Sequence, residues 1–561
     1  MNILGINYVY HDSSACILKD GELVVALEEE RFNRNKHDTS FPYQSIAKCL
    51  EIAELSLDDI DHIAFSFQPS LDMGKKVAFT LKKPRYLIAN FKLHMLRYYW
   101  LNRTIKQWYH STFNRGRKPQ LHFIPHHQSH VAGSFYASPY EEAALLSMDG
   151  SGEWATASLG VGRGNQVTEF KSIYYPYSMG TVYEAITLFC GFKPAYDEGK
   201  TMGLAPLGNS QTFIDKARKI VSVSDDGDLQ IDFDYFNFDS GQYHYLSDKF
   251  IAEFGRPRSN KAPFEQHHLD VAAAFQEVLE EVGLKMANIL HEKTKTDYLV
   301  IAGGVSLNSV MNGRIVRESP FKDVYVMPAA GDNGTAIGAA YCVYNGLLQQ
   351  PRAKAHMNPY LGTEYSNEFI ESVLKECKLS YRQIDDIESE AARLLHEGNI
   401  ICWFQGRMEI GPRALGCRSI LADPTQPHMK DKINAEVKHR EAYRPFAPSV
   451  IAEAREDFFD LPVDAPFMLK VCNVMEDKKS VLPAITHVDG SARVQTVHDE
   501  TNPRYHKMIK AFGELSGVPV VLNTSFNIMG EPIVESPYHA IRCFFSTGLD
   551  YLVIGNFVVG K

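Results

Sequence analysis

Two histidines and two aspartates in this sequence could together bind a metal ion. His126 and His130 are four positions apart, a spacing that stacks two imidazoles on one face of a helix. Asp149 follows an apolar run in a turn of small residues, and Asp332 lies in a similar turn. In a chain with 21 histidines, such a pair can also arise by chance. Together with the two carboxylates, however, it forms a ligand set that suits Fe(II), Mn(II) or Zn(II).

Basic residues beside glycine or proline form a second group, towards the C-terminus. They are Arg413, Arg418, Lys438, Arg444 and Arg493. Arginine suits planar, bidentate binding of phosphate or carboxylate. Pro445 and Pro448 exclude a helix through Arg444 and predict a rigid, extended segment. Surface ion pairs are the alternative interpretation, but arginines in three loops of one small region favour a phosphate site.

Small polar residues follow predicted buried strands at two further places. The strand at 298–302 runs into glycines and then a helix, with Gly304 and Asn308 in the turn. Such a turn lets backbone N–H groups approach an anionic or nucleotide ligand. Asn523 and Ser525 end the strand that begins near residue 518, where an open α/β sheet places its ligand contacts.

The elements that must position these residues predict an α/β protein in two parts. A strand–loop–strand pattern at residues 3–27 appears again at 143–161, as in the duplicated actin-like ATPase fold. A linker-like segment at 346–358 precedes a second α/β region of ordinary domain size. We therefore expect domains at 1–350 and 351–561.

Two further segments are charged or irregular and carry no clear motif. The run from Glu28 to Lys36 follows a strand and is expected to be the solvated start of a helix. Residues 223–266 are rich in Asp, Phe and Tyr, look less regular, and could cover a site or bind a substrate.

Composition describes a globular protein of the reducing cytoplasm. The chain has 561 residues and a net charge of −10, which disfavours attraction of its whole surface to nucleic acid. Nine scattered cysteines without a CxxC spacing argue against zinc fingers and disulfide scaffolds. We expect no membrane span and no signal peptide. A homodimer is left open.

Seven motifs, taken together, resemble the ATP-dependent O-carbamoyltransferases. They read HHQSH, DGSGE, EGKTMGLAP, GGVSLN, GPRALGCRS, RPFAPS and LNTSFNIMGEPIV. The family includes enzymes of the nodulation-protein-U type and enzymes that carbamoylate tobramycin or cephems. The resemblance covers nearly the whole chain in order, and departs from the family pattern at 75–118 and 223–266.

The resemblance implies a fold and a reaction. The first domain resembles the actin-like (ASKHA) domain of the tRNA threonylcarbamoyl transferase, and the second resembles a YrdC-type domain. In the family, the YrdC-like domain makes carbamoyl-adenylate and pyrophosphate from carbamoyl phosphate and ATP, with Mg accompanying the ATP. The first domain then passes the carbamoyl group to a hydroxyl of an acceptor.

The resemblance also implies roles for individual residues. The metal ligands would be His126, His130, Asp149 and Asp332, with Fe(II) favoured over Mn or Zn. Contacts to carbamoyl-adenylate in the first domain would include Lys36, Gly304 and Asn308. ATP and carbamoyl phosphate would meet Arg413, Arg444, Arg493 and Asn523, with Lys438, Arg418 and Ser525 close by. His11 stands where the family has its catalytic histidine, although an ordinary loop histidine is the alternative; a neutral imidazole near an alcohol can act as a general base.

The sequence also bears on three alternative functions. A tRNA threonylcarbamoyl transferase would lack the arginine-rich second domain. A hydrogenase-maturation carbamoyltransferase would need an acylphosphatase domain and CxxC zinc motifs, which this chain lacks. A non-catalytic actin-like ATP-binding scaffold would leave the arginines without a use.

The stretch from Lys75 to Lys118 holds twelve Lys or Arg, nine aromatic residues, and no Asp or Glu. In a chain of net negative charge, this stretch is a local field of opposite sign. One interpretation is a solvated face over an aromatic core. The other is a site for an anionic acceptor, such as a nucleotide, a phosphorylated sugar or lipid, or a nucleic acid.

Overall fold

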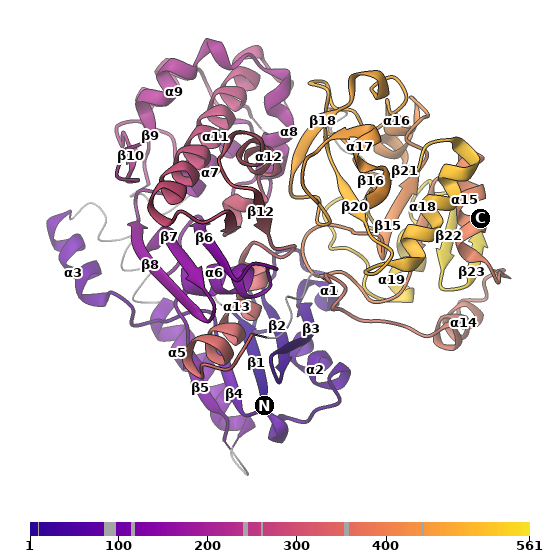
Figure 1. Cartoon of the computed structure of the whole chain (residues 1–561), viewed down its shortest axis with the longest axis horizontal. Coiled ribbons are helices and arrows are strands. Elements are labelled where there is room, and N and C mark those ends of the chain that lie inside the picture. The colour runs from indigo at the N-terminus through magenta and orange to yellow at the C-terminus, as the bar shows by residue number, and fades with distance from the viewer. Residues whose placement is uncertain are drawn as a thin grey trace. The chain divides into compact units, whose positions relative to one another are not determined.

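The computed structural model describes most of the chain in two compact units (Figure 1). The described residues are 1–8, 10–83, 97–113, 118–238, 245–259, 262–352, 358–438 and 443–561, with only the backbone described at 97 and 98. The N-terminal unit comprises Met1–Val25 and Thr39–Met357, and the C-terminal unit comprises Ala26–Asp38 and Asn358–Lys561. The contacts thus group residues 26–38 with the C-terminal part. The predicted assignment of 1–350 and 351–561 to two catalytic domains stays a prediction.

Two five-stranded sheets of the N-terminal unit repeat one plan. The first has the order β3-β2-β1-β4-β5 and the second the order β12-β11-β6-β7-β8. In each, an antiparallel meander (β1–β3 or β6–β8) is extended on its first strand by parallel strands. The strands are β1 (Asn2–Asn7), β2 (Ser14–Lys19), β3 (Glu22–Glu28), β4 (His62–Phe65), β5 (Gln120–Phe123), β6 (Glu142–Met148), β7 (Ala155–Arg163), β8 (Gln166–Tyr174), β11 (Tyr298–Ala302) and β12 (Asp323–Val326). The predicted duplication and the α/β class are confirmed.

Helices α6 (His126–Tyr136) and α13 (Thr335–Tyr341) pack between the two sheets. α6 contacts β6, β7 and β11, while α13 contacts β1, β2 and β4. Glycines allow the two helices to come very close, because a Cβ on Gly338 would lie 1.7 Å from the carbonyl oxygen of Ser129. This contact fixes the start of each helix relative to the other.

The remaining elements of this unit flank the sheets. Their bounds are α2 (Tyr43–Ile52), α3 (Met73–Lys82), α5 (Arg97–Thr112), α7 (Met179–Phe189), α8 (Glu198–Leu204), α9 (Ile214–Ile220), β9 (Val221–Val223), β10 (Leu229–Ile231), α10 (Asp248–Phe254), α11 (Gln266–Thr294) and α12 (Ser309–Glu318). The segment 223–266 is more regular than expected where it is described, because it contains β10 and α10 and pairs β10 with β9. No helix in the described ranges is long and apolar enough to cross a membrane.

The C-terminal unit is built on an eight-stranded mixed sheet with the order β13-β23-β22-β14-β15-β21-β16-β20. Alternate residues of β14 face opposite layers. Cys402 and Phe404 join the core beneath α14 and α19, whereas Ile401 and Trp403 join the core beneath α15 and α18. A three-stranded sheet, β17-β18-β19, completes the unit.

Helices and strands alternate along most of this unit. Its elements are α1 (Glu30–Asn33), α14 (Asn367–Glu376), β13 (Arg382–Gln383), α15 (Ile387–His396), β14 (Ile401–Phe404), β15 (Arg418–Ala422), α16 (Met429–Ile433), β16 (Ala447–Ile451), α17 (Arg455–Phe458), β17 (Phe459–Asp460), β18 (Val471–Val474), β19 (Ser491–Arg493), β20 (Gln495–Val497), α18 (Pro503–Ser516), β21 (Val520–Ser525), α19 (Pro537–Phe545), β22 (Tyr551–Ile554) and β23 (Phe557–Gly560).

The prediction of a solvated segment from Glu28 to Lys36 was wrong. Glu28 and Arg31 are 5% and 3% exposed, and Arg31 forms ion pairs with Glu28 and Glu30. Arg31 also donates to the carbonyl oxygen of Gly411 at 2.7 Å. A charged side chain can be buried when its charge is matched and its donors are satisfied, as they are here. The prediction was thus wrong for residues 28–31, which are buried, whereas Asn35 and Lys36 at the end of the segment are exposed.

Candidate functional site

The four predicted metal ligands come together in the N-terminal unit. One ligand atom from each of His126, His130, Asp149 and Asp332 lies within 4.8 Å of the others, and all four side chains are buried. The Nε2 atoms of His126 and His130 are 3.1 and 3.2 Å from Oδ2 of Asp149. They are 3.4 and 3.5 Å from Oδ1 of Asp332. The structure therefore brings together the four side chains that the sequence analysis selected. Their role as metal ligands stays a prediction.

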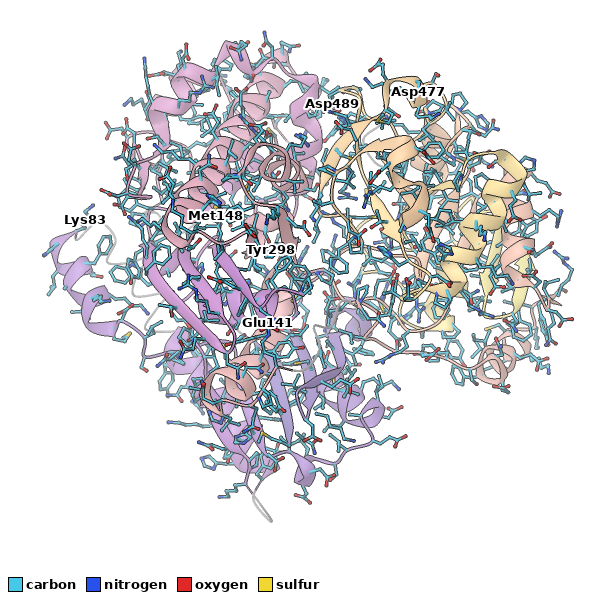
Figure 2. The ribbon with its side chains drawn as sticks, in the orientation of Figure 1. Lys83, Glu141, Met148, Tyr298, Asp477 and Asp489 are labelled. Atoms are coloured by element: carbon cyan, nitrogen blue, oxygen red, sulfur yellow. The ribbon has the colours of Figure 1, made fainter. Side chains whose placement is uncertain are left out.

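Each ligand sits at the end of an element. The helix α6 starts at His126, so both histidines lie in its first turns and on one face. Asp149 directly follows β6, whose last residue, Met148, is labelled in Figure 2. Asp332 begins the short 3₁₀ turn Asp332–Gly334 that leads into α13. The close packing of α6 on α13 therefore aligns ligands from distant parts of the sequence.

The donor set fits a divalent cation. The Nε2 atoms of His126 and His130 face one another at 3.0 Å, an arrangement that a shared cation explains because both nitrogens then offer lone pairs. Burial alone would lower the pKa of His126, but the charges of Asp332 and Asp149 raise it well above its usual value. The pocket thus carries an excess of negative charge that a bound cation would neutralise. Which metal binds stays a prediction.

Two neighbours hold this centre in place. Glu153, which is 2% exposed, accepts the backbone N–H of His126 and that of Gln68. His127 bonds to Ser147 and to the carbonyl oxygen of Ala155. Burial lowers the pKa of His127 to about 3, which leaves it neutral and structural. The sequence analysis assigned no role to either residue; the glutamate in DGSGE was the available signal.

His11 lies in the loop between β1 and β2. Its Nδ1 atom is 2.8 Å from Oδ2 of Asp12, and its Nε2 atom is 4.0 Å from Oδ2 of Asp332. The Asn7 side chain donates to the carbonyl oxygens of both His11 and Asp12 and so fixes the loop. The structure brings His11 to the edge of the metal cluster, as its proposed role requires. The sequence analysis missed Asp12.

The predicted adenylate contacts have mixed placements. Gly304 donates its N–H to Oδ1 of Asp149 at 3.1 Å, so it supports a metal ligand. The Asn308 side chain caps α12 and pairs with Gln276 in both directions. Lys36 is an exposed residue of the segment that belongs to the C-terminal unit. Contacts of these three residues with carbamoyl-adenylate stay predictions.

Arg413 and Arg444, two of the predicted phosphate-binding residues, are neighbours in the C-terminal unit. Burial and the charge of Arg444 lower the pKa of Arg413 to about 10. The Nε atom of Arg413 is buried and has no hydrogen-bond partner among the described atoms. Two neighbouring guanidinium groups, one of them half-buried and paired with no carboxylate among the described residues, are costly unless an anion joins them.

Asn523 lies on β21 of the eight-stranded sheet, and its side chain presents an unsatisfied acceptor. It is 1% exposed, and its Nδ2 donates to Ala414, Ser449 and Gln495. Its Oδ1 atom is buried without a hydrogen-bond partner in the described structure. A buried amide oxygen of this kind is suited to a donor group of a ligand.

Lys438 and Ser525 also meet. Nζ of Lys438 donates to the carbonyl oxygens of Ser525 and Asn527, at 2.5 and 3.0 Å. Lys438 thus contacts Ser525, the last residue of the strand β21 on which Asn523 lies. Arg493 is the last residue of β19 and lies two positions from Gln495, a contact of Asn523.

Arg418 occupies a different kind of position. It is fully buried and donates to the carbonyl oxygens of Gln405, Gly406, Cys417 and Thr363. Its guanidinium also stacks over the ring of Phe404 at 3.7 Å. Carbonyl oxygens accept from both Nη atoms of Arg418, and only its buried Nε has no partner in the described structure. The structure therefore favours a supporting role for Arg418 rather than ligand contact.

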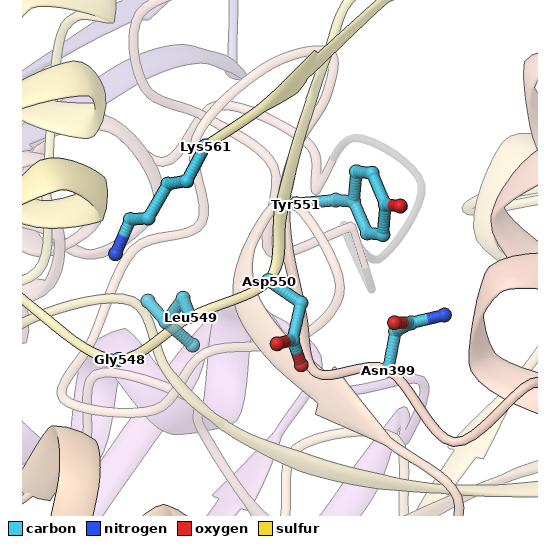
Figure 3. Close-up of a pocket in the computed structure, with 6 residues that line it drawn as sticks. All are labelled: Asn399, Gly548, Leu549, Asp550, Tyr551 and Lys561. Carbon is cyan, nitrogen blue, oxygen red and sulfur yellow. The ribbon is translucent and has the colours of Figure 1, made fainter.

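Figure 3 shows a separate hollow of the C-terminal unit, of about 310 Å³. It is lined by Asn399, Gly548, Leu549, Asp550, Tyr551 and Lys561. The Asp550 carboxylate already pairs with Lys432 and accepts the N–H of Ile400. None of the predicted site residues lines this hollow.

Comparison with known proteins gives a consistent result. Residues 2–341 match a family model described as Carbamoyltransferase N-terminus, and residues 392–561 match one described as Carbamoyltransferase C-terminus. An uncharacterized protein of Synechocystis sp. is 43% identical over 100% of this chain and 97% of its own length. Nodulation protein NolNO of Sinorhizobium fredii is 37% identical over 99% of this chain and 80% of its own. A 3'-hydroxymethylcephem-O-carbamoyltransferase of Amycolatopsis lactamdurans is 35% identical over 51% of this chain and 52% of its own.

Proposed function

Because the chain belongs to the carbamoyltransferase family, we propose that it is an ATP-dependent O-carbamoyltransferase with two separate sites. Carbamoyl-adenylate forms in the C-terminal unit, and the carbamoyl group reaches an acceptor hydroxyl in the N-terminal unit. The observation that carries the proposal is the ligand cluster with His11 at its edge in one unit, together with the paired guanidinium groups in the other.

The first half-reaction joins two anions. For the atoms to balance, water hydrolyses carbamoyl phosphate to carbamate and inorganic phosphate, and a carbamate oxygen then attacks the α-phosphorus of ATP while pyrophosphate leaves. Fixed cations lower the repulsion between the reactants. Arg413 and Arg444 supply such cations, and the partial burial of Arg413 reduces the screening of its charge by water. Arg493 and Lys438 add positive charge near the same strand ends.

The buried oxygen of Asn523 suits the carbamoyl group itself. A carbamoyl amide presents two N–H donors, and Oδ1 of Asn523 is an acceptor without a partner in the described structure. A ligand that lacks this donor would leave the oxygen unsatisfied, which disfavours its binding. Asn523 therefore distinguishes a carbamoyl group from an ester or a simple acyl group.

The second half-reaction needs a base at the acceptor hydroxyl. Burial lowers the pKa of His11, but Asp332 and Asp12 raise it to about 10. Nε2, the atom that faces the cluster, would therefore take the hydroxyl proton only when a bound cation offsets the charge of Asp332. The hydroxyl oxygen then bonds to the carbamoyl carbon, and AMP leaves. A divalent ion held by His126, His130, Asp149 and Asp332 would supply Lewis acidity near the transferred group.

Two chemical properties are expected of the acceptor: a hydroxyl group and a negative charge on the acceptor or on the surface that carries it. An acceptor must bear a hydroxyl group, as in the cephem carbamoyltransferase relatives. The twelve cations between Lys75 and Lys118 favour a negatively charged partner for the N-terminal unit, either the acceptor or the surface that carries it.

Measurement of pyrophosphate release tests the proposal. Wild-type protein should release pyrophosphate only when ATP and carbamoyl phosphate are both present. Arg444→Ala should lower this release at least about 100-fold, because a charged hydrogen bond to a polyanion is lost. His11→Asn should still release pyrophosphate while losing roughly 10²-fold in transfer to an acceptor hydroxyl. Normal pyrophosphate release by a folded Arg444→Ala protein would contradict the assignment.

A further inference from the structure

Two helices of the N-terminal unit expose large apolar side chains. On α3, Val77 is 52% exposed and Leu81 is 76% exposed, the largest value among the large hydrophobic residues that the structure describes. On α5, Tyr99 and Trp100 are 56% and 59% exposed. Val77 and Leu81 are four positions apart and so project from one side of their helix.

The exposed groups do not belong to the core. Helix α5 buries its opposite side through Leu101, Ile105 and Trp108. Helix α3 packs through Phe79, whose ring lies 5.8 Å from that of Trp154. Both helices thus keep an apolar side in solvent after their packing side is satisfied, and such exposure marks interaction surfaces.

Exposed cations accompany these apolar residues. They are Lys75, Lys82, Lys83, Arg103, Lys106 and Lys118, and Figure 2 labels Lys83 just after the end of α3. The guanidinium of Arg103 lies over the Trp100 ring at 5.8 Å. Among the described members of the stretch, Lys75 pairs with Asp72, and Lys76 is buried near Glu153. The predicted cations Arg85, Lys92, Arg97, Arg115 and Arg117 lie outside the described side chains.

Whether the exposed apolar residues are aromatic or aliphatic helps to distinguish a nucleic acid from a lipid as the anionic partner. Bases stack on aromatic rings, so Tyr99 and Trp100 alone would suit a nucleic acid as well as a lipid. Aliphatic side chains such as Val77 and Leu81 offer no stacking face, yet they partition readily between acyl chains. Lysines beside aliphatic residues on one helix, and beside Trp and Tyr on another, are typical of helices that lie on acidic bilayers.

We propose that α3 and α5 dock the protein on the surface of a bilayer rich in acidic phospholipid. The lysines bind the headgroups, while Leu81, Val77 and Trp100 enter the interface. The inference rests on the proposed function, because it identifies the negatively charged partner of the N-terminal unit as an acidic membrane surface. Its test uses binding alone, so its failure and that of the proposed reaction are distinguishable.

Vesicle co-sedimentation of the full chain tests the proposal. The probes are vesicles of phosphatidylcholine alone and vesicles with about one third phosphatidylglycerol. We expect binding to the acidic vesicles that weakens as salt rises from about 0.1 M to about 0.5 M. Leu81→Glu, and separately Lys82→Glu with Lys83→Glu, should each weaken this binding roughly tenfold or more.

Matched variants control for the loss of a leucine or of two lysines. Leu347 is 59% exposed and lies in the π-helical turn Cys342–Leu347, so Leu347→Glu should leave vesicle binding unchanged. Lys19→Glu with Lys219→Glu removes two exposed lysines of the same unit outside α3 and α5. Thermal melting and pyrophosphate release should be unchanged in all of these variants.

Three results would overturn the proposal. One is equal binding of wild-type protein to the two kinds of vesicle, or no binding to either. A second is equal loss of binding in Leu81→Glu and Leu347→Glu. The third is tight binding of a single-stranded oligonucleotide that the α3 variants abolish while vesicle binding persists, which would make the stretch a nucleic-acid surface.

Discussion

At the scale of single residues, Asp12 decides how His11 can act. The carboxylate of Asp12 lies 2.8 Å from Nδ1 of His11, which leaves Nε2 towards Asp332. A carboxylate on one ring nitrogen fixes the tautomer and presents the other nitrogen as a base. Asp12 adopts a left-handed backbone with φ of 54°, a conformation that Asn also tolerates.

The variant Asp12→Asn should keep the fold and lose the transfer step. We expect transfer to an acceptor hydroxyl to fall on the order of 10²-fold, because the amide no longer holds the ring in its basic form. Pyrophosphate release should persist, and the rate of each half-reaction is the measurement. Asp20→Asn is the matched control, since Asp20 also has a positive φ, of 50°, but pairs with the N-terminal amine. Equal transfer by the two variants would remove Asp12 from the mechanism.

At the scale of elements, the packing of α6 on α13 positions the metal ligands. A Cβ added at Gly338 would meet the Ser129 carbonyl oxygen at 1.7 Å, so one helix would have to move. His130 follows Ser129 directly, and Asp332 starts the turn before α13. Any movement therefore separates ligands that must stay within hydrogen-bond range of one another.

The variant Gly338→Ala should bind less metal than wild type. We expect a loss of stability of roughly 1–3 kcal/mol from overpacking, together with lower metal occupancy measured by elemental analysis. Gly346→Ala is the control, because the nearest atom to its added Cβ, Oη of Tyr136, is 4.0 Å away. Full occupancy in Gly338→Ala would show that the helices can separate without disturbing the ligands.

The helix α19 carries a histidine whose titration should weaken the C-terminal unit in acid. Burial and the charges of Arg34 and Arg542 lower the pKa of His539 to about 4, although Glu535 lies 4.0 Å from its ring. Between about pH 6.5 and pH 4, His539 is protonated in the unfolded chain but stays neutral in the folded protein. The stability that the neutral histidine contributes is therefore present above pH 6.5 and is lost as pH falls.

The variant His539→Gln should show a flatter stability curve over that pH range. We expect a difference on the order of 1 kcal/mol, measured by denaturant unfolding at several pH values. His396→Gln replaces an exposed histidine of α15 and should keep the wild-type slope. An unchanged slope in His539→Gln would contradict the prediction.

At the scale of the whole molecule, the two sites should respond independently to metal removal. The four ligands lie in the N-terminal unit, and the guanidinium pair lies in the C-terminal unit. Chelation should therefore abolish transfer to the hydroxyl while Mg-dependent pyrophosphate release survives after Mg is restored. Asp332→Asn should reproduce this result, since the loss of one carboxylate weakens the site. Loss of both half-reactions in Asp332→Asn would show that the sites are coupled.

The sequence by itself determined the types of residue in both sites and the repeated architecture that holds one of them. The spacing of His126 and His130 requires only a helix, and the strand–loop–strand pattern requires only local alternation, so both could be predicted. The helix α15 also has a strong apolar periodicity, which depends only on local sequence.

Tertiary structure alone decided how charges far apart in the sequence are matched. Arg31 is buried because Glu28 and the Gly411 carbonyl, 380 positions away, satisfy it. Arg418 follows Arg413 by only five positions, yet carbonyl oxygens surround the guanidinium of Arg418, whereas the charged neighbour of Arg413 is Arg444. A sequence shows the charge of a side chain but not its desolvation or its partners, and these two quantities separate a structural arginine from a binding one.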